Sequence, residues 1–314
     1  MLPHPVLQHS MGTFKKLGRY MAKACAQWWR GGLKAVTDDT VAELRQRFGI
    51  HELSVRIQRM EQKLNPLVST WAATNWIEHA TLKTTPLVSV ILPTYNRSGL
   101  LGRAVDSVCA QIYPRWEIIV VDDGSTDCTP AVVQQLRNKL GDDRLQTLRI
   151  SHSGVCAARN RALARARGEF VVYLDDDNFM APLWLKAVVW AFSQRPDVDV
   201  VYGGIIVDDL RRLNRRDSGD LPAYYLHPFD RDQLLQDNLA DIGQIAHRRG
   251  LPEARFDETL REMGDWDLLL RLTREKAPLV IPALACFYST QAPDRLSGGP
   301  TYDADAARVR EKAR

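Results

Sequence analysis

The sequence predicts an α/β fold, in which a doubly wound and mostly parallel sheet follows an α-helical extension. From Leu87 onward, short apolar runs rich in β-favouring residues alternate with amphipathic helical segments, and the connections between them are short. Three of these runs end in polar or acidic residues, at the edge where open α/β sheets bind their ligands. The composition agrees with an ordinary soluble globular protein, because 45% of the 314 residues are hydrophobic and 25% are charged.

Residues 1–86 are expected to form a basic helical extension. They hold twelve Lys and Arg against six Asp and Glu, whereas the whole chain has a net charge of only +4. Apolar residues recur every three or four positions over 14–28 and again over 41–64, which predicts amphipathic helices. A basic helix with Trp28-Trp29 is typical of an element at an anionic lipid surface, but packing against protein explains it equally well. Residues 13–64 are therefore expected to make either peripheral membrane contacts or homo-oligomer contacts.

Neither the cysteines nor the hydropathy pattern indicates a secreted or membrane-spanning protein. The five cysteines are scattered and contain no CxxC pair, which argues against a disulfide framework and against a zinc site. No run of eighteen apolar residues exists, and the N-terminus lacks the apolar core of a signal peptide. We therefore expect a cytoplasmic protein, peripheral at the inner face of the membrane if the extension binds lipid.

The α/β domain is expected to span residues 87–298, after a linker that ends at Pro86, with a polar tail at 299–314. Its first half contains four strands joined by helices. The predicted strands are 88–92, 117–121, 145–150 and 170–174, and the predicted helices are 100–109, 129–140 and 155–167. Thr129-Pro130 supplies an N-cap and a first-turn proline. In the second half we expect strands at 198–202 and 204–208, and a helix that starts near Gly264-Asp265.

Polar residues follow three of the predicted strands. They are Pro93 to Arg97, Asp122 to Ser125, and the acidic triplet Asp175-Asp176-Asp177. Taken alone, the triplet fits a solvated turn before the next helix as well as it fits a metal or ligand site. Because the carboxyl ends of parallel strands meet at one edge of a sheet, we expect the three segments to share one site.

Five segments in order closely resemble the inverting family-2 glycosyltransferases of the GT-A fold. They are Val88-Ser-Val-Ile-Leu-Pro-Thr-Tyr-Asn-Arg97, Val120-Val-Asp-Asp-Gly-Ser-Thr126, Gly154-Val-Cys-Ala-Ala-Arg-Asn160, Tyr173-Leu-Asp-Asp-Asp177 and Asp265-Trp-Asp-Leu-Leu-Leu-Arg271. The resemblance covers Leu87 to about Ser297 and leaves the extension outside. It implies the GT-A nucleotide-diphospho-sugar transferase fold.

The resemblance also implies the donor-binding residues. Tyr95, in the turn with Pro93 and Thr94, would be a platform for the nucleotide base, and Asp123 would accept from a base imide N–H. An ordinary turn aromatic and a helix-capping acid are the structural alternatives for these two residues. Arg97 and Arg159 are candidates for nucleotide or diphosphate contacts, since guanidinium groups suit phosphate oxygens.

The acidic triplet matches the DXD motif of this family. By resemblance Asp177 is the direct metal ligand, Asp175 contacts the ribose or the metal waters, and Asp176 contributes through the nucleotide or the backbone geometry. Carboxylate ligands favour Mn2+ or Mg2+, bound together with substrate phosphates. Gly203-Gly204 is expected to allow the backbone to approach the donor sugar closely.

Asp265 matches the general base of the family, in the first turn of its helix. The family frequently has Glu-Asp at this point and this chain has Gly264-Asp265, which leaves the positioning of the acceptor open. Asp267 is expected to be structural because it is turned away on the helix. His152 and His247 are the other possible bases, although a polar contact is the more common role for such histidines.

The function implied is transfer of a sugar from a nucleotide-diphosphate sugar, foremost a UDP-sugar, to an acceptor hydroxyl with inversion. The acceptor would be a glycan, a lipid-linked molecule or another hydroxyl compound, in bacterial surface polysaccharide or other glycan assembly, with no nucleic-acid partner. No QxxRW pattern follows Asp265, so one sugar per encounter is expected rather than processive synthesis. The alternatives are a sugar nucleotidyltransferase and a non-catalytic scaffold of a glycan-assembly complex.

Overall fold

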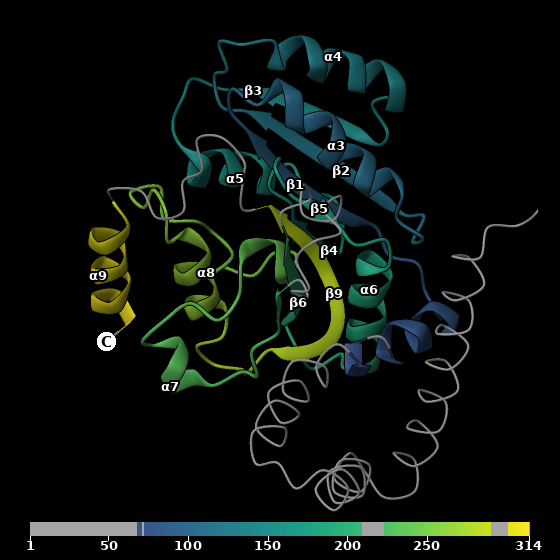
Figure 1. Cartoon of the computed structure of the whole chain (residues 1–314), viewed down its shortest axis with the longest axis vertical. Helices are drawn as coiled ribbons and strands as arrows, with labels where there is room; N and C mark the ends of the chain where they lie inside the picture. The colour runs from purple at the N-terminus through teal and green to yellow at the C-terminus, as the bar shows by residue number, and fades with distance from the viewer. Residues whose placement is uncertain (1–67, 71, 209–222, 290–300, 314) are drawn as a thin grey trace, which may run out of the picture. The chain divides into compact units, whose positions relative to one another are not determined.

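The computed structural model describes residues 68–70, 72–208, 223–289 and 301–313. The chain divides into two compact units, Met1–Asn65 and Pro66–Arg314, of which only the second is described (Figure 1). The helices predicted between residues 14 and 64 lie outside the described residues, and so do the membrane-surface and self-association hypotheses that rest on them.

Strands and helices alternate in the predicted order from Val88 to Tyr173, and the second half contains elements that were not predicted. The strands are β1 (Val88–Thr94), β2 (Trp116–Asp122), β3 (Leu145–Arg149), β4 (Phe170–Tyr173), β5 (Phe179–Met180), β6 (Val200–Asp208), β7 (Ala223–Tyr225), β8 (Ile245–Arg248) and β9 (Leu279–Ser289). The helices are α3 (Ser98–Cys109), α4 (Thr129–Leu140), α5 (Val155–Leu163), α6 (Trp184–Gln194), α7 (Arg231–Leu234), α8 (Gly264–Leu272) and α9 (Tyr302–Ala313), with a 3-10 turn η1 (Ile242–Gln244).

The nine strands in the described part of the chain belong to one sheet, with the order β3-β2-β1-β4-β8-β6-β9-β5 and with β7 paired to β6. The half made of β3, β2, β1 and β4 is parallel, as predicted, because α3, α4 and α5 provide the crossovers that parallel neighbours need. The other half is mixed, since β8 runs antiparallel between β4 and β6. The predicted α/β fold class is therefore confirmed, and parallel pairing recurs in the second half between β6 and β9.

Two hydrophobic cores cover the two faces of the sheet. One contains Val88, Val90 and Leu92 of β1 together with side chains of α3 and α6, and the other contains Ile91 with side chains of α5, α8 and α9. Every residue of β1 and β2 is buried, as expected of strands covered on both faces. Figure 1 shows β9 curving through the centre of this arrangement beside α6.

Both ends of the compact unit differ from the expected boundaries. Residues 72–79 are helical and pack onto the α/β unit, since Ile77 is buried in the core and Trp76 contacts Trp190 edge-on, with 4.9 Å between ring centroids. At the other end, the stretch expected to be a polar tail contains α9, which buries Ala306 and Val309. The folded unit therefore uses residues on either side of the range 87–298.

Gly203 and Gly204 lie inside one continuous strand, β6, where two strands separated at Gly203 were expected. The register of β6 against β9 shifts on either side of Gly204. A Cβ on Gly203 would lie 2.6 Å from the indole of Trp184 and from the carbonyl oxygen of Ala283, and a Cβ on Gly204 would overlap Tyr224. The close approach that we expected for the donor sugar is thus made by the protein's own side chains and backbone.

No helix among the described residues is long and apolar enough to cross a bilayer. The four cysteines in this part of the chain, Cys109, Cys128, Cys156 and Cys286, are all free thiols.

His247 lies in the core on β8 and does not reach the candidate site. Its Nε2 is 2.7 Å from the Tyr173 hydroxyl and its Nδ1 is 2.8 Å from the carbonyl oxygen of Arg248. Because a carbonyl only accepts, Nδ1 carries the proton and Nε2 accepts from tyrosine. Burial lowers the pKa of His247 to about 4. A role as general base is therefore not supported for this residue.

This depressed pKa predicts a loss of stability in mild acid. The unfolded chain takes up a proton on His247 near pH 6.5 and the folded chain only near pH 4, so stability falls as the pH drops between these values. His247→Gln, which does not titrate, should remove about 2 kcal/mol of the difference in unfolding free energy between pH 7 and pH 5. Urea unfolding at both pH values measures it, with exposed His79→Gln as control. Equal pH dependence of both variants would contradict the assignment.

Candidate functional site

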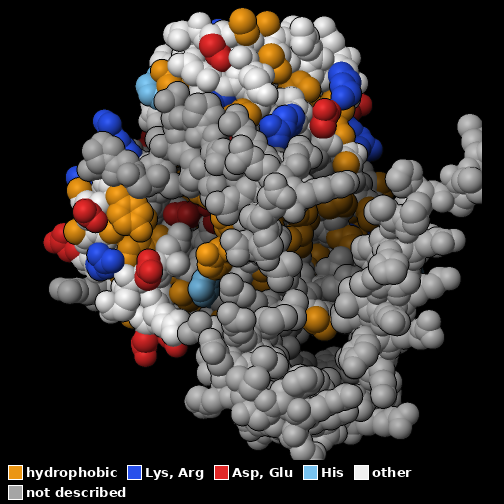
Figure 2. All heavy atoms as spheres, viewed as in Figure 1, with side chains coloured by type: hydrophobic (Ala, Val, Ile, Leu, Met, Phe, Trp, Pro, Cys, Tyr) orange, Lys and Arg blue, Asp and Glu red, His pale blue; other side chains and the backbone are white. Residues whose placement is uncertain are grey.

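A cleft of about 780 Å³ opens at the carboxyl ends of β1, β2 and β4. Figure 2 shows acidic side chains recessed in a hollow near the middle of the molecule. All ten residues predicted for the site line this cleft, namely Pro93, Thr94, Tyr95, Arg97, Asp123, Arg159, Asp175, Asp176, Asp177 and Asp265. The three strand ends and the start of α8 therefore meet, as the topology of the first half of the sheet requires.

Asp176 is the buried anchor of the acidic triplet. Its carboxylate accepts from the Thr94 hydroxyl at 2.7 Å and from Nη1 of Arg97 at 2.8 Å. Burial raises the pKa of Asp176 to about 6, although Arg97 and Thr94 favour the charged form. The same Arg97 nitrogen lies 2.7 Å from Asp177. The turn after β1 thus fixes the conformation of the triplet through Thr94 and Arg97. Asp176 has a structural role, because it is the carboxylate that both residues bind.

Asp175 is paired with Arg159 of α5. The distance from Nη2 of Arg159 to Oδ1 of Asp175 is 2.6 Å. Arg159 is buried, whereas Arg161 of the same helix is exposed, and so are Arg165 and Arg167, which follow the end of α5. Of these four arginines only Arg159 lines the cleft.

Asp123 and Tyr95 form the wall at the ends of β1 and β2. The two oxygens of the Asp123 carboxylate accept from the backbone N–H groups of Ser153 and Gly154, at 2.8 and 2.9 Å. His152 Nδ1 lies 2.9 Å from the same carboxylate, and the imidazole ring stacks on Tyr95 with 4.1 Å between centroids. His152 is therefore a polar contact that orders this wall, and Tyr95 is 39% exposed.

Asp265 lies in the first turn of α8 and faces the cleft. Its Oδ1 accepts from the backbone N–H of Trp266 at 2.8 Å. Burial raises the pKa of Asp265, the Asp175 charge raises it further, and the Arg159 charge opposes both effects. A carboxylate with a raised pKa at a helix start is suited to take a proton from a hydroxyl.

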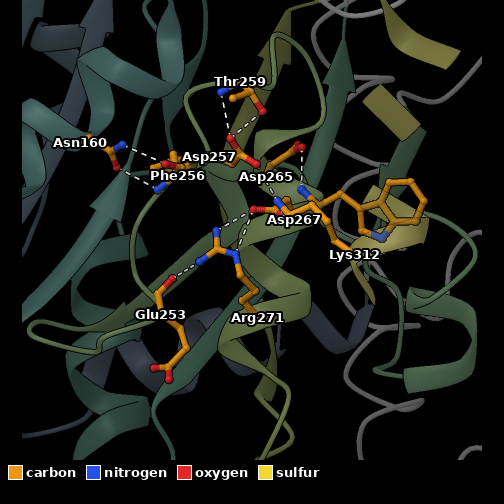
Figure 3. A network of polar contacts seen from close by, with 10 residues as sticks. Asn160, Glu253, Phe256, Asp257, Thr259, Asp265, Asp267, Arg271 and Lys312 are labelled. Carbon is orange, nitrogen blue, oxygen red and sulfur yellow. Dashed lines mark hydrogen bonds and ion pairs between the residues drawn. The ribbon is translucent and has the colours of Figure 1, made fainter. Parts of the chain in front are cut away.

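Asp267 belongs to a structural network behind the cleft (Figure 3). Its Oδ2 accepts from Nη2 of Arg271 at 2.7 Å, and its Oδ1 lies 2.5 Å from Nζ of Lys312 on α9. Lys312 also binds Asp257 at 2.8 Å, and this interaction holds the pKa of Asp257 well below its usual range. The structural interpretation of Asp267 therefore agrees with its contacts.

The loop before α8 closes one side of the cleft and was not predicted. Glu258 and Glu262 of this loop line the cleft. Asn160 of α5 and Asp305 of α9 hold the loop by hydrogen bonds to its backbone. No sequence pattern marks this loop, because its partners come from two distant helices.

Asp241 is a further carboxylate of the cleft that the sequence interpretation missed. It caps η1 with a capping box, in which Asp241 accepts from the backbone and Gln244 returns a bond to the N–H of Asp241. One pattern in the sequence predicts this cap, because Asp-x-x-Gln at 241–244 has the spacing of a capping box. Burial raises the pKa of Asp241 to about 8, and the charges of Asp175 and Asp265 act in the same direction.

The residues present fit a divalent cation bound jointly with a substrate. Within the described residues no three His, Cys, Asp or Glu side chains form a ready metal cage. Burial and the neighbouring Asp175 raise the pKa of Asp177, although Arg97 opposes them, so negative charge in this corner is incompletely balanced. Carboxylates of this kind hold Mg2+ or Mn2+ when substrate phosphates complete the coordination.

The packing around Gly264 leaves little room for a glutamate beside Asp265. A Cβ at position 264 would lie 2.7 Å from Sγ of Cys156 and 3.4 Å from the ring of Phe256. Cys156 is buried, and burial raises the pKa of its thiol to about 11. The thiol occupies the space through which a longer side chain at 264 would have to pass.

Gly264→Ala is accordingly expected to lower the free energy of unfolding by about 1–3 kcal/mol, as overpacking of a core does. Adding Cys156→Ala to this variant should recover most of the loss, because it removes the atom that the new methyl group meets. Urea unfolding of the two single variants and the double variant measures the coupling. Additive effects would contradict the proposed contact.

Comparison with known proteins identifies relatives along this part of the chain. The model of "Glycosyl transferase family 2" matches residues 89–253. WcaA of Escherichia coli K12, named as a colanic acid biosynthesis glycosyl transferase, is 32% identical over 195 residues, which cover 62% of this chain and 68% of WcaA. TuaG of Bacillus subtilis 168, named as a teichuronic acid biosynthesis glycosyltransferase, is 45% identical over 94 residues, which cover 30% of this chain and 36% of TuaG.

The crystal structure of S. aureus TarS 1-349 in complex with UDP-GlcNAc has a TM-score of 0.57 at 21% identity, and the match covers 72% of this chain and 66% of that one. At this identity the likeness concerns the fold, and it agrees with the predicted GT-A fold.

Proposed function

Because the chain belongs to glycosyl transferase family 2, we propose that it transfers a sugar from a UDP-sugar to an acceptor hydroxyl with inversion at the anomeric carbon. One sugar is transferred per encounter. The observation that carries this proposal is the meeting of the β1 turn, the acidic triplet and Asp265 in one cleft. Clefts of this size hold ligands as large as a nucleotide sugar.

The donor would lie along the carboxyl ends of β1, β2 and β4. Tyr95 stacks on the base, Asp123 accepts from the base, and Arg97 and Arg159 approach the diphosphate. Both arginines are paired with carboxylates of the triplet, so each would bind phosphate while it remains within the carboxylate cluster. Pro93 and Thr94 shape the turn that presents Tyr95.

Asp177, with Asp175 beside it, would hold Mn2+ or Mg2+ together with the donor phosphates. Such an ion supplies Lewis-acid stabilisation to the departing nucleoside diphosphate. The protein's own contribution here is to orient the carboxylates. Arg97 binds Asp177, Arg159 binds Asp175, and Thr94 binds the neighbouring Asp176.

Asp265 takes the proton of the acceptor hydroxyl as it attacks the anomeric carbon. A single displacement with one base inverts the configuration, and the cleft offers this base at the start of α8. WcaA and TuaG are named for the biosynthesis of colanic acid and of teichuronic acid. By analogy we place this enzyme in the assembly of a bacterial polysaccharide, acting from the cytoplasmic side of the membrane.

Thermal shift measurements with UDP, dTDP, GDP and CMP, each with Mn2+ and with chelator, test the donor and the metal. One nucleotide should stabilise the protein, by about 2.7 kcal/mol at a hundredfold excess over its Kd, and chelation should remove the effect. Transfer from the matching nucleotide sugar, followed by NMR of the anomeric proton, tests inversion. Binding without turnover would favour a scaffold, and formation of a nucleotide sugar from a sugar phosphate would favour a nucleotidyltransferase.

A further inference from the structure

His152 lies on the loop between β3 and α5 and lines the cleft together with Tyr95 and Asp123. Its imidazole ring stacks on Tyr95, with 4.1 Å between the ring centroids and an angle of 19° between the ring planes. Its Nδ1 lies 2.9 Å from Oδ2 of Asp123 and 3.2 Å from the carbonyl oxygen of the same residue. Because a carboxylate and a carbonyl only accept, Nδ1 carries the proton and the imidazole donates to Asp123.

These two contacts are the same ones that the proposed function gives to the nucleobase. A base bound at this wall stacks on Tyr95 and donates a ring N–H to Asp123. The imidazole is also a planar ring, and it already stacks on Tyr95 and donates a ring N–H to Asp123. The imidazole and the base therefore compete for the same two partners.

The Asp123 carboxylate keeps its place without His152, because the backbone holds it. Its two oxygens accept from the N–H groups of Ser153 and Gly154, at 2.8 and 2.9 Å. A carboxylate has about four lone-pair sites, so it binds these two donors and a further N–H at the same time. The donor from His152 can thus be exchanged for a donor from a ligand.

The turn that carries Tyr95 is also held without His152. The backbone N–H of Asn96 donates to Oγ of Ser125 at 2.9 Å, and Oδ1 of Asn96 accepts from the N–H of Thr126 at 2.7 Å. The His152 side chain is 57% exposed, so it can turn into solvent without opening the core. The imidazole can therefore leave the wall while its two partners stay in position.

We propose that His152 occupies the nucleobase subsite as a surrogate for the base and that the sugar-nucleotide donor displaces it on binding. This inference rests on the proposed function. The nucleotide then binds only those molecules in which the imidazole has left the wall, and its apparent affinity is reduced by that fraction. The same ring returns when the nucleoside diphosphate leaves, so His152 weakens the binding of the product as well as that of the donor.

The experiment compares His152→Ala with the unaltered full chain by calorimetry in the presence of Mn2+. UDP probes the base and the diphosphate subsites together, and inorganic pyrophosphate probes the diphosphate subsite alone. The matched control is His227→Ala. This exposed histidine also stacks on a tyrosine, Tyr225, and it is not among the residues that line the cleft.

His152→Ala should lower the Kd of UDP about 3–10-fold, because a stacking contact and a hydrogen bond no longer have to be broken. The Kd of pyrophosphate should stay within twofold, and His227→Ala should change neither value. A Kd of UDP that is unchanged or higher in His152→Ala would overturn the inference, because the imidazole would then be inert or would support the base from behind Tyr95.

The inference and the proposed function fail by different results. If none of UDP, dTDP, GDP and CMP binds to either protein, the proposed function fails and the inference falls with it. If a nucleotide binds, but no more tightly to His152→Ala than to the unaltered chain, only the inference fails. A nucleotide other than UDP takes the place of UDP in the same comparison.

Discussion

Asp265→Asn is expected to lower the rate of sugar transfer by about 10²–10⁴-fold, the range that general base catalysis contributes. Asparagine has the same shape and can still accept from the N–H of Trp266, so folding and donor binding should persist. The measurement is kcat for transfer at saturating donor, together with the Kd of the nucleotide. A rate within threefold of the unaltered enzyme would remove Asp265 as the base.

The pH dependence of the same reaction adds a second readout. Since burial raises the pKa of Asp265, the rate should rise with pH through an acidic limb that lies above the usual carboxyl range. The remaining activity of Asp265→Asn should lack this limb. Glu258→Gln is the matched control, because Glu258 lines the same cleft and is given no part in the chemistry.

Asp305→Ala is expected to lower the free energy of unfolding by about 3 kcal/mol. The buried Asp305 carboxylate accepts from the backbone N–H groups of Arg261 and Glu262, at 2.7 and 2.9 Å. Hydrogen bonds to a charged group contribute about 1.5–3 kcal/mol each, and alanine would leave both donors unpaired. Urea unfolding measures the loss, and Asp303→Ala, an exposed acid two residues earlier on α9, is the control.

The same substitution should also affect the acceptor side of the cleft. Arg261 and Glu262 line the cleft just before Asp265, so a loosened loop should raise the KM for the acceptor while the Kd of the nucleotide stays unchanged. Asp305→Asn, which keeps one accepting oxygen, should recover part of both losses. An unfolding free energy equal to that of Asp303→Ala would show that α9 does not support the loop.

The parallel half of the fold and its site could be predicted because the relevant signals are local. Each strand of this half is a short apolar run, and each polar segment follows its strand directly in the sequence. Parallel pairing then brings Tyr95, Asp123 and Asp177 to one edge whatever the loops do. Asp265 is far along the chain and was identified only through its motif.

The residues that were missed or misassigned depend on contacts between distant segments. The approach expected at Gly203 is made by Trp184 and Ala283, and no local pattern indicates which neighbour fills that space. The C-terminal helix looks like a polar tail because only a few of its side chains are buried, and their partners lie in α8 and in the preceding loop.

By itself, the sequence determined the α/β class, the family resemblance and ten of the residues that line the cleft, since apolar periodicity and strand-end motifs are properties of short segments. The tertiary structure alone decided the pairing of Arg97 and Arg159 with the triplet, the burial of His247, and the entry of Asp241 into the cleft. Burial and charge pairing arise from segments that meet only when the sheet is assembled. These two effects determine which carboxylates are held in ion pairs within the protein and which remain available to a ligand.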